Sequence, residues 1–178
     1  MARDGNGVKV TPPHPRHPLA ATVVFLLFGG PAIVVAVVPW LLSGFRVRPP
    51  FLGWEPWRWI GVALIALGSG LVLDALARFV RQGRGTPSPV GQTEHLVVSG
   101  AYRFVRNPMY VAVIAILVGE ALLLGSAAVL AWAAAVTALF AVWVRVYEEP
   151  RLRRLFGAEY EAFCRRVPRW FPRLGARG

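Results

Sequence analysis

The sequence contains very little cysteine, lysine or acid. Cys164 is the only cysteine, and Lys9 is the only lysine among 20 basic residues. A single cysteine excludes a disulfide within the chain, and the three histidines form no zinc motif with it. Only 9 aspartate and glutamate residues oppose the basic ones, which leaves a net charge of +11.

The positive charge comes from arginines that lie mainly beside apolar segments. Membrane proteins mark their cytoplasmic side and contact anionic lipid in this way. We therefore expect membrane lipid as a partner and no nucleic acid. Residues 1–18 are polar and have neither an early apolar run nor a cleavage site, so we expect a disordered cytoplasmic tail rather than a signal peptide.

Long apolar blocks dominate the rest of the chain. Hydrophobic residues make up 56% of it, and the mean hydropathy is +0.51. About 20 apolar residues are needed to cross a hydrocarbon core of about 30 Å. The sequence therefore predicts an all-α membrane protein, in which residues 19–178 form one domain with about four transmembrane helices. The four blocks are residues 19–42, 59–80, 108–124 and 127–146.

The arginines also predict the orientation in the membrane. Four spans place the N-terminal tail, the loop at 81–106 and the tail at 147–178 on one side, and these segments hold most of the arginines. Both termini are therefore expected in the cytoplasm, with a plasma or bacterial inner membrane as the location. In the C-terminal tail, apolar residues at helical spacing predict an amphipathic helix at the interface. These residues are Leu152, Leu155, Phe156 and Phe163.

The segment 100–110 contains a first group of residues suited to binding. Asn107 precedes Pro108, which is typical of a first helical turn, so Asn107 is expected to cap the third block. A helix N-terminus carries partial positive charge and can hold a carboxylate. A positive-inside loop with interfacial aromatics would explain the same composition. The other residues of this group are Gly100, Tyr102, Arg103, Arg106 and Tyr110.

A second group lies at the end of the fourth block, where Glu148 and Glu149 are adjacent. Two carboxylates beside a membrane are costly unless they are paired or solvated. Arg145 precedes them by three and four residues and so shares their helix face. Such carboxylates can bind hydroxyl or amino groups or accept a proton, which makes these three residues candidates for catalysis. A salt-bridged cap of a juxtamembrane helix is the alternative.

Four other residues have simple structural explanations as well. Gly68 and Gly70 allow another helix, or a flat ring, to approach the second block, and helix packing is the commoner reason. Glu120 lies within the third block, where a carboxylate is either functional or paired near the outer interface with Arg58. Cys164 is expected to be inert.

Both polar groups belong to longer patterns. The stretch HLVVSGAYRFVRNPMY at 95–110 resembles LV-x-x-G-x-Y-x-x-x-R-[HN]-P-x-Y, and EEPRLRRLFGAEYEAFCRRVPRWFP at 148–172 resembles EE-x-x-L-x-x-x-FG-x-x-Y-x-x-[YF]-x-x-x-VPR-x-x-P. These patterns are similar to those of the membrane methyltransferases that include isoprenylcysteine carboxyl methyltransferase and phosphatidylethanolamine N-methyltransferase. The resemblance covers residues 59–172.

This resemblance implies a pocket for S-adenosylmethionine (SAM) at the cytoplasmic ends of the last helices. The residues implied to bind SAM are Arg106, Asn107, Pro108, Tyr110, Glu148 and Glu149. The implied neighbours are His95, Leu96, Val97, Gly100 and Tyr102, with Gly68 and Gly70 corresponding to a G-x-G of the phosphatidylethanolamine branch. Asn107 stands where the carboxyl methyltransferase branch has histidine, which argues against a prenylcysteine acceptor.

The expected reaction is direct transfer of the SAM methyl group to a lipophilic or amphipathic small molecule, without a metal. Glu148 or Glu149 would act as a base only where the acceptor is protonated. Two alternatives stay open. Membrane sterol reductases carry similar segments and use NADPH, and a non-enzymatic scaffold would explain the spans and the arginines. The acceptor and the oligomeric state do not follow from the sequence.

Overall fold

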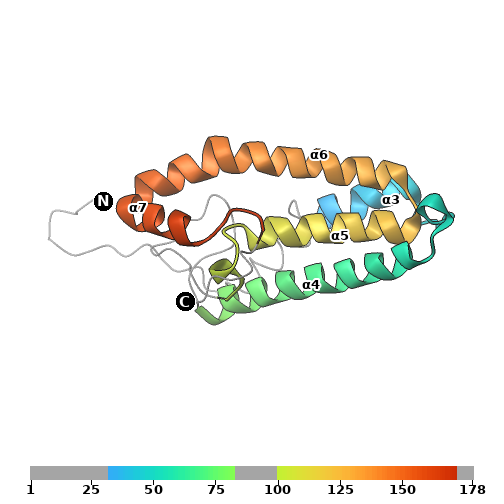
Figure 1. Ribbon diagram of the computed structural model, residues 1–178, viewed down its shortest axis with the longest axis horizontal. Helices are drawn as coiled ribbons and strands as arrows, with labels where there is room; N and C mark the ends of the chain where they lie inside the picture. The colour runs from blue at the N-terminus through green and yellow to red at the C-terminus, as the bar shows by residue number, and fades with distance from the viewer. Residues whose placement is uncertain (1–31, 83–99, 172–178) are drawn as a thin grey trace, which may run out of the picture.

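The computed structural model describes residues 32–82 and 100–171, except for the side chains of residues 75–82 (Figure 1). These residues form helices and turns without a strand, which confirms the all-α class for this part of the chain. The expected tail at 1–18, most of the first apolar block, and His95, Leu96 and Val97 lie outside the described residues. The elements are the short π-helix η1 (Ile33–Val37), α3 (Val38–Ser43), the 3-10 turn η2 (Phe51–Gly53), α4 (Pro56–Gln82), the 3-10 turn η3 (Gly100–Arg103), α5 (Pro108–Leu124), α6 (Ala127–Trp143), the short π-helix η4 (Val144–Glu148) and α7 (Glu149–Arg166).

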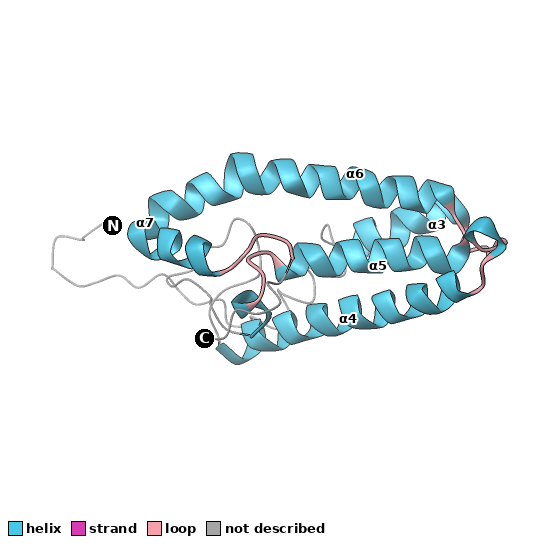
Figure 2. Cartoon of the chain, in the orientation of Figure 1, coloured by secondary structure: helices cyan, strands magenta, loops and turns pink. Residues whose placement is uncertain are grey.

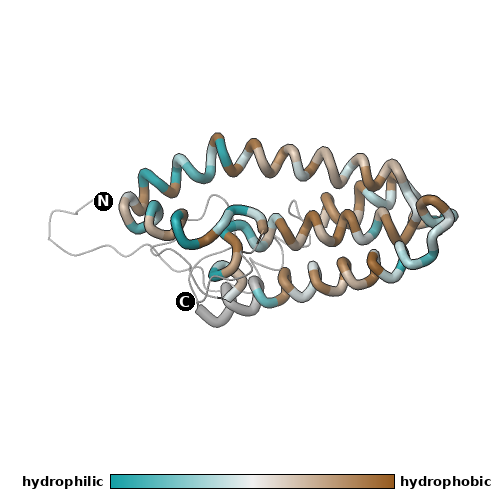
Figure 3. The backbone as a smooth tube through the Cα atoms, viewed as in Figure 1, coloured by the Kyte–Doolittle hydropathy of each residue, from teal (hydrophilic) through white to brown (hydrophobic). Residues whose placement is uncertain are grey.

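Three long helices, α4, α5 and α6, run side by side along the long axis of the molecule (Figure 1). α3 lies beside α5 and α6 towards one end, whereas η3 and α7 lie at the other end (Figure 2). Hydrophobic residues dominate the middle of the bundle, and hydrophilic residues are concentrated on α7 (Figure 3). The polar sequence motifs therefore share one end of an apolar bundle.

Within residues 32–82 and 100–171, two helices are long and apolar enough to cross a membrane, against the four expected for the whole chain. They are Pro56–Asp74 within α4 and the helical segment Ala127–Arg166, in which residues 127–144 carry no charged side chain. Two other apolar helices, Ile33–Ser43 and Pro108–Leu124, are shorter. The 17 residues of α5 span roughly 26 Å, because a proline begins this helix and a left-handed glycine ends it. That length is slightly less than a hydrocarbon core of about 30 Å.

Small residues allow α4 and α5 to pack closely. A Cβ atom added to Gly68 would lie 2.7 Å from the carbonyl oxygen of Ala112, and one added to Gly61 would lie 2.6 Å from that of Gly119. Neither position has room for a side chain, so van der Waals contact between the backbones holds the two helices together, as in other membrane interfaces. Gly70 has open space beside it. Helix packing therefore explains Gly68 but not Gly70.

The apolar core joins η1, α5 and α6. Leu117 of α5 is fully buried and belongs to the same cluster as Val136 of α6 and Val34 of η1. In a π-helix, the carbonyl group of Val34 would pair with the N–H of residue 39, but Pro39 has none. The indole Nε1 of Trp132 donates a 3.0 Å hydrogen bond to that carbonyl oxygen instead. The proline in the first apolar block thus fixes how η1 is joined to α6.

The turn at Gly125 and Ser126 joins α5 and α6 into a helical hairpin. Gly125 has φ 61°, a left-handed conformation that favours glycine, and it ends α5. The hydroxyl of Ser126 accepts a 3.4 Å hydrogen bond from the N–H of Val129 and so caps α6.

Arg58 does not pair with Glu120 as expected. Its Nε lies 3.0 Å from Oε2 of Glu55, three residues earlier, and its Nη2 donates to the carbonyl oxygen of Arg48 at 3.0 Å. Glu55 immediately precedes α4 and lies three residues before Arg58, so a carboxylate close in the sequence takes the place of Glu120. Oε2 of Glu120 is buried and has no hydrogen-bond partner in the described part of the chain.

The C-terminal helix is continuous with α6 and does not begin at a break near residue 146. η4 links α6 to α7 in one helical segment of 40 residues. α7 bends at Gly157 (φ 49°, ψ −122°), and its second half turns back towards the start of α5 (Figure 1). Three of the four expected apolar residues, Leu152, Phe156 and Phe163, join one cluster, whereas Leu155 is 56% exposed.

Gly68→Val is expected to destabilise the bundle, whereas Gly70→Val, two residues away on the same helix, is expected to be tolerated. Valine at position 68 must displace the backbone of α5, and overpacking of this kind costs about 1–3 kcal/mol. Valine at position 70 meets open space. Thermal unfolding of both variants in detergent measures the difference, and equal midpoints would contradict the close packing of Gly68.

Candidate active site

Three segments that are distant in the sequence meet at the α7 end of the bundle. They are the turn before α5 (100–107), the junction of η4 and α7 (148–149) and the extended residues after α7 (167–169). Pro108 occupies the first turn of α5, as expected, and Asn107 precedes it in a non-helical conformation (φ −123°, ψ 57°). This helix start places Arg106 and Tyr110 beside the start of α7.

Glu149 lies at the centre of the site and is only 4% exposed. Its Oε1 accepts hydrogen bonds from Nη1 of Arg106 at 3.1 Å and from Nε of Arg169 at 2.6 Å. Its Oε2 accepts a third, from Nη2 of Arg169 at 2.9 Å. Arg169 thus binds the carboxylate through two parallel hydrogen bonds, a strong geometry for such a pair. A carboxylate this deeply buried would be strongly disfavoured without these partners.

Hydrogen bonds from the turn before α5 also hold the backbone that follows α7. The N–H of Arg106 donates to the carbonyl oxygen of Pro168 at 2.9 Å. Nδ2 of Asn107 donates to the carbonyl oxygen of Arg169 at 3.3 Å. Asn107 occupies the cap position of α5 but makes no side-chain cap hydrogen bond, contrary to the expectation. Its amide holds the C-terminal segment instead.

Glu148 has surroundings different from those of Glu149. The hydroxyl of Tyr110 donates to its Oε2 at 2.9 Å. Within the described residues no arginine forms an ion pair with it. The hydroxyl of Tyr102 lies close enough to be affected by its charge. Glu148 therefore faces two tyrosines rather than two arginines.

The two adjacent carboxyl groups consequently have opposite pKa shifts. Burial tends to raise the pKa of Glu149, but the hydrogen bond from Arg169 and the nearby arginine charges outweigh it and lower that pKa. Burial raises the pKa of Glu148, the hydrogen bond from Tyr110 lowers it, the charge of Glu149 raises it, and the net shift is upward. Burial and the charge of Glu148 raise the pKa of Tyr102 to about 12. Neighbouring acids with diverging pKa values are typical of sites that divide acid and base roles.

Arg145 does not join this group. It is exposed, and its side chain makes no hydrogen bond or ion pair to any residue that the structure describes. It lies in η4, where a π-helix pairs residue i with i+5 instead of i+4. The α-helical spacing that would place Arg145 on the same face as the two glutamates therefore does not hold here.

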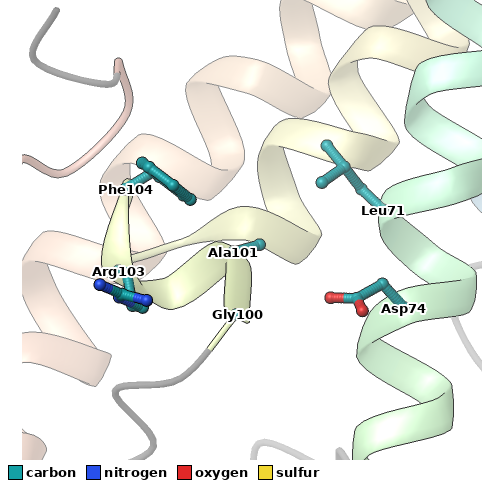
Figure 4. Close-up of a pocket in the computed structure, with 6 residues that line it drawn as sticks. All are labelled: Leu71, Asp74, Gly100, Ala101, Arg103 and Phe104. Atoms are coloured by element: carbon teal, nitrogen blue, oxygen red, sulfur yellow. The ribbon is translucent and has the colours of Figure 1, made fainter.

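A hollow of about 520 Å³ lies between α4 and η3 (Figure 4). The carboxylate of Asp74 points from α4 towards η3 (Figure 4). Gly70 lies four residues before Asp74 and so shares its helix face, whereas Gly68 faces α5. Since η3 also carries Tyr102, this turn borders both the hollow and the carboxylate pair. The lining residues are Leu71, Asp74, Gly100, Ala101, Arg103 and Phe104.

Two residues of the site were not expected from the sequence. Arg169 pairs with Glu149. The only sequence feature that pointed to Arg169 was the VPR segment of the second pattern. Cys164, expected to be inert, lies next to Arg106, whose Nη1 donates to its Sγ at 2.8 Å. No spacing rule indicated that contact, because 58 residues separate the two side chains.

The family model described as phospholipid methyltransferase matches residues 57–159, more than half of the 178 residues. The chain belongs to the phospholipid methyltransferase family. The matched range contains Arg106, Tyr110 and both glutamates, and the family points to a membrane methyltransferase. Neither a curated protein nor a solved structure matches the chain.

Glu149→Gln is expected to destabilise this phospholipid methyltransferase family member at neutral pH, whereas Glu148→Gln is expected to leave its stability unchanged or raise it. Loss of the Glu149 charge breaks a mostly buried ion pair, which costs about 3 kcal/mol. Glu148 carries a desolvation cost as an anion that glutamine does not have. Thermal midpoints in detergent measure both effects.

The two glutamates should also differ in their response to pH. Folding lowers the pKa of Glu149, so its stabilisation is full above the ordinary value of about 4.3 and is lost as the pH falls through the lower folded value. Folding raises the pKa of Glu148, so its contribution is full below about 4.3 and is lost as the pH rises through the folded value. Glu161→Gln, in an exposed pair with Arg153, is the control, with an expected effect below about 1 kcal/mol. Parallel pH responses of the Glu148 and Glu149 variants would refute the assignment.

Proposed function

We propose that this chain transfers a methyl group from SAM to a lipophilic or amphipathic acceptor at the cytoplasmic face of a membrane. The contact between the two polar motifs supports this most directly. Arg106 pairs with Glu149, and Tyr110 donates to Glu148, at the polar end of an apolar bundle. The family match makes methyl transfer the reaction class.

The side chains at this end fit a cofactor that is cationic overall. SAM carries a sulfonium and an ammonium group against a single carboxylate. Glu148 and Asp74 offer carboxylate oxygens of the kind that accept from an ammonium group or from ribose hydroxyls. Nε of Arg106 is buried without a hydrogen-bond partner among the residues described here, and it can donate to the cofactor carboxylate.

Bound SAM would supply the methyl group, and the protein would bind and orient the reactants. Glu148 contacts the cofactor, or accepts a proton from an acceptor that is protonated. Tyr110 holds Glu148 through its hydroxyl, and Tyr102 lies within reach of the Glu148 charge. Alignment of the acceptor with the sulfonium in a site of low water content then accounts for most of the acceleration.

The membrane arrangement that we propose keeps the four expected spans, with the α7 end in the cytoplasm. α5 is short, but tilting and local thinning of the bilayer accommodate a small mismatch. Arginines support the orientation, because they are more numerous at the α7 end than at the opposite end. Those at the α7 end include Arg103, Arg106, Arg145, Arg151, Arg153, Arg154, Arg165, Arg166 and Arg169, against Arg46, Arg48 and Arg58 at the other.

NADPH suits the same residues less well. Its phosphate groups need arginines or a helix N-terminus as partners. Arg106 and Arg169 already pair with Glu149, and the charge of Glu148 would repel a phosphate placed beside it. The immediate surroundings of Glu148 therefore favour a cation over a phosphate.

Calorimetric titration of SAM, and separately of NADPH, into the detergent-purified protein tests this proposal. SAM is expected to bind the wild type, and Glu148→Gln is expected to weaken binding about 10-fold to 100-fold, as for the loss of a hydrogen bond to a charged group. Glu161→Gln, with an exposed carboxylate, should bind like the wild type. NADPH binding without SAM binding would assign the chain to the reductases, and binding of neither would favour the scaffold.

A further inference from the structure

We infer that Arg169 is a positioning residue of the methyl-transfer site, acting through Glu149 on Glu148 and Arg106. The inference rests on the proposed function, because the site it concerns is the proposed SAM site. Arg169 lies beyond residues 57–159, which the family model matches. Its role therefore has to be argued from its contacts in this chain.

The backbone that carries Arg169 is fixed at three successive residues. Val167 leaves the helix in an extended conformation (φ −113°, ψ 124°) and is 8% exposed, within the cluster formed by α7. The carbonyl oxygen of Pro168 accepts from the N–H of Arg106, and that of Arg169 accepts from the amide of Asn107. These contacts hold the backbone in the position from which the guanidinium group of Arg169 reaches Glu149.

Arg169 limits how Arg106 can bind Glu149. A guanidinium group facing a carboxylate normally takes both oxygens. Here Arg169 occupies Oε2 and shares Oε1, so Arg106 is restricted to one hydrogen bond, through Nη1. Nε of Arg106 stays unpaired within the described residues. Without Arg169, Arg106 is free to turn onto both oxygens, which removes Nε from the site.

Arg169 also fixes the direction of Glu148. The three hydrogen bonds that guanidinium groups of the described residues donate to a carboxylate at this site all go to Glu149, and Glu148 faces the tyrosines. Glu148 and Glu149 are consecutive residues of one helical segment and project in different directions, so anchoring the Glu149 side chain sets the direction of its neighbour. The hydrogen bond between Tyr110 and Glu148 therefore depends on the ion pair between Arg169 and Glu149. Arg169 itself makes no hydrogen bond to Tyr110 or to Glu148.

Cys164 provides a first test that needs no cofactor. It is the only cysteine, and its thiol contacts the same guanidinium group of Arg106. Arg169→Ala is expected to raise the limiting rate of iodoacetamide labelling of Cys164, measured where the rate no longer rises with pH, by about tenfold. Arg169→Lys keeps the charge without the planar fork and should fall between Ala and the wild type. Arg165→Ala is the control, because Arg165 is exposed near the end of α7. Wild-type labelling rates in both Arg169 variants would overturn the inference.

A double-mutant cycle on SAM affinity tests positioning against a general loss of stability. Arg169→Ala is expected to weaken SAM binding about tenfold, but to change it little further in a Glu148→Gln background, because its effect passes largely through Glu148. Additive losses would overturn the inference while leaving the proposed function intact. If the wild type binds no SAM, the proposed function fails, and the labelling rates still report whether Arg169 holds Arg106. Should Arg169→Ala not fold, Arg169→Lys takes its place in the cycle.

Discussion

The burial of one carboxylate, that of Glu149, constrains the whole polar end of the molecule. A carboxylate that is 4% exposed has to be paired with cations. Its partners are Arg106 in the turn before α5 and Arg169 in the segment after α7. These partners are 43 and 20 residues away in the sequence. Buried ion pairs contribute more to a unique geometry than to net stability in several proteins. We interpret this one in the same way, as the contact that fixes where three segments meet.

The apolar part of the bundle supplies the rigid half of that arrangement. α5 lies between α4 and α6, and Ala112, Leu117 and Ala121 along it are fully buried. Since lipid offers no hydrophobic gain for helix association, close backbone contact at Gly68 and Gly61 has to hold α5 in place. Arg106 and Tyr110 flank the start of this fixed helix. Glu148 ends a π-helix and Glu149 begins α7, and a π-helix is a local irregularity often found at functional sites.

Local rules of sequence predicted the features that depend on neighbouring residues. The all-α class, the start of α5 at Pro108 and the meeting of the two motifs follow from spacing, helix signals and resemblance. Predictions were wrong where a residue distant in the sequence, or an irregular helical turn, determines the contacts of a side chain. The amide of Asn107 binds a carbonyl 62 residues away instead of capping its helix, and Arg145 is displaced by a π-helix.

The failures share a physical cause. Helical spacing describes which residues of one helix share a face, but it says nothing of what lies opposite that face. The bend at Gly157 has no strong sequence signal, since a single glycine inside a helical pattern is usually tolerated. That bend nevertheless turns the chain back towards α5 and so brings Arg169 to Glu149. Of the four expected spans, most of the first lies outside the described residues, and α5 is short because its flanking proline and glycine bound it.

Two glutamates that look equivalent in the sequence are thus unequal in the fold. Glu149 pairs with two arginines, which lower its pKa and favour its ionised form. Glu148 faces two tyrosines, and burial raises its pKa and favours its protonated form. Under the proposed function this difference has a consequence for binding. A cationic cofactor placed beside Glu148 favours its ionised form, so cofactor binding and loss of the Glu148 proton are coupled. Glu149, already charged and paired, has little to gain from the same cation. The carboxylate that responds to the cofactor is therefore the one that has no ion pair with an arginine among the residues the structure describes.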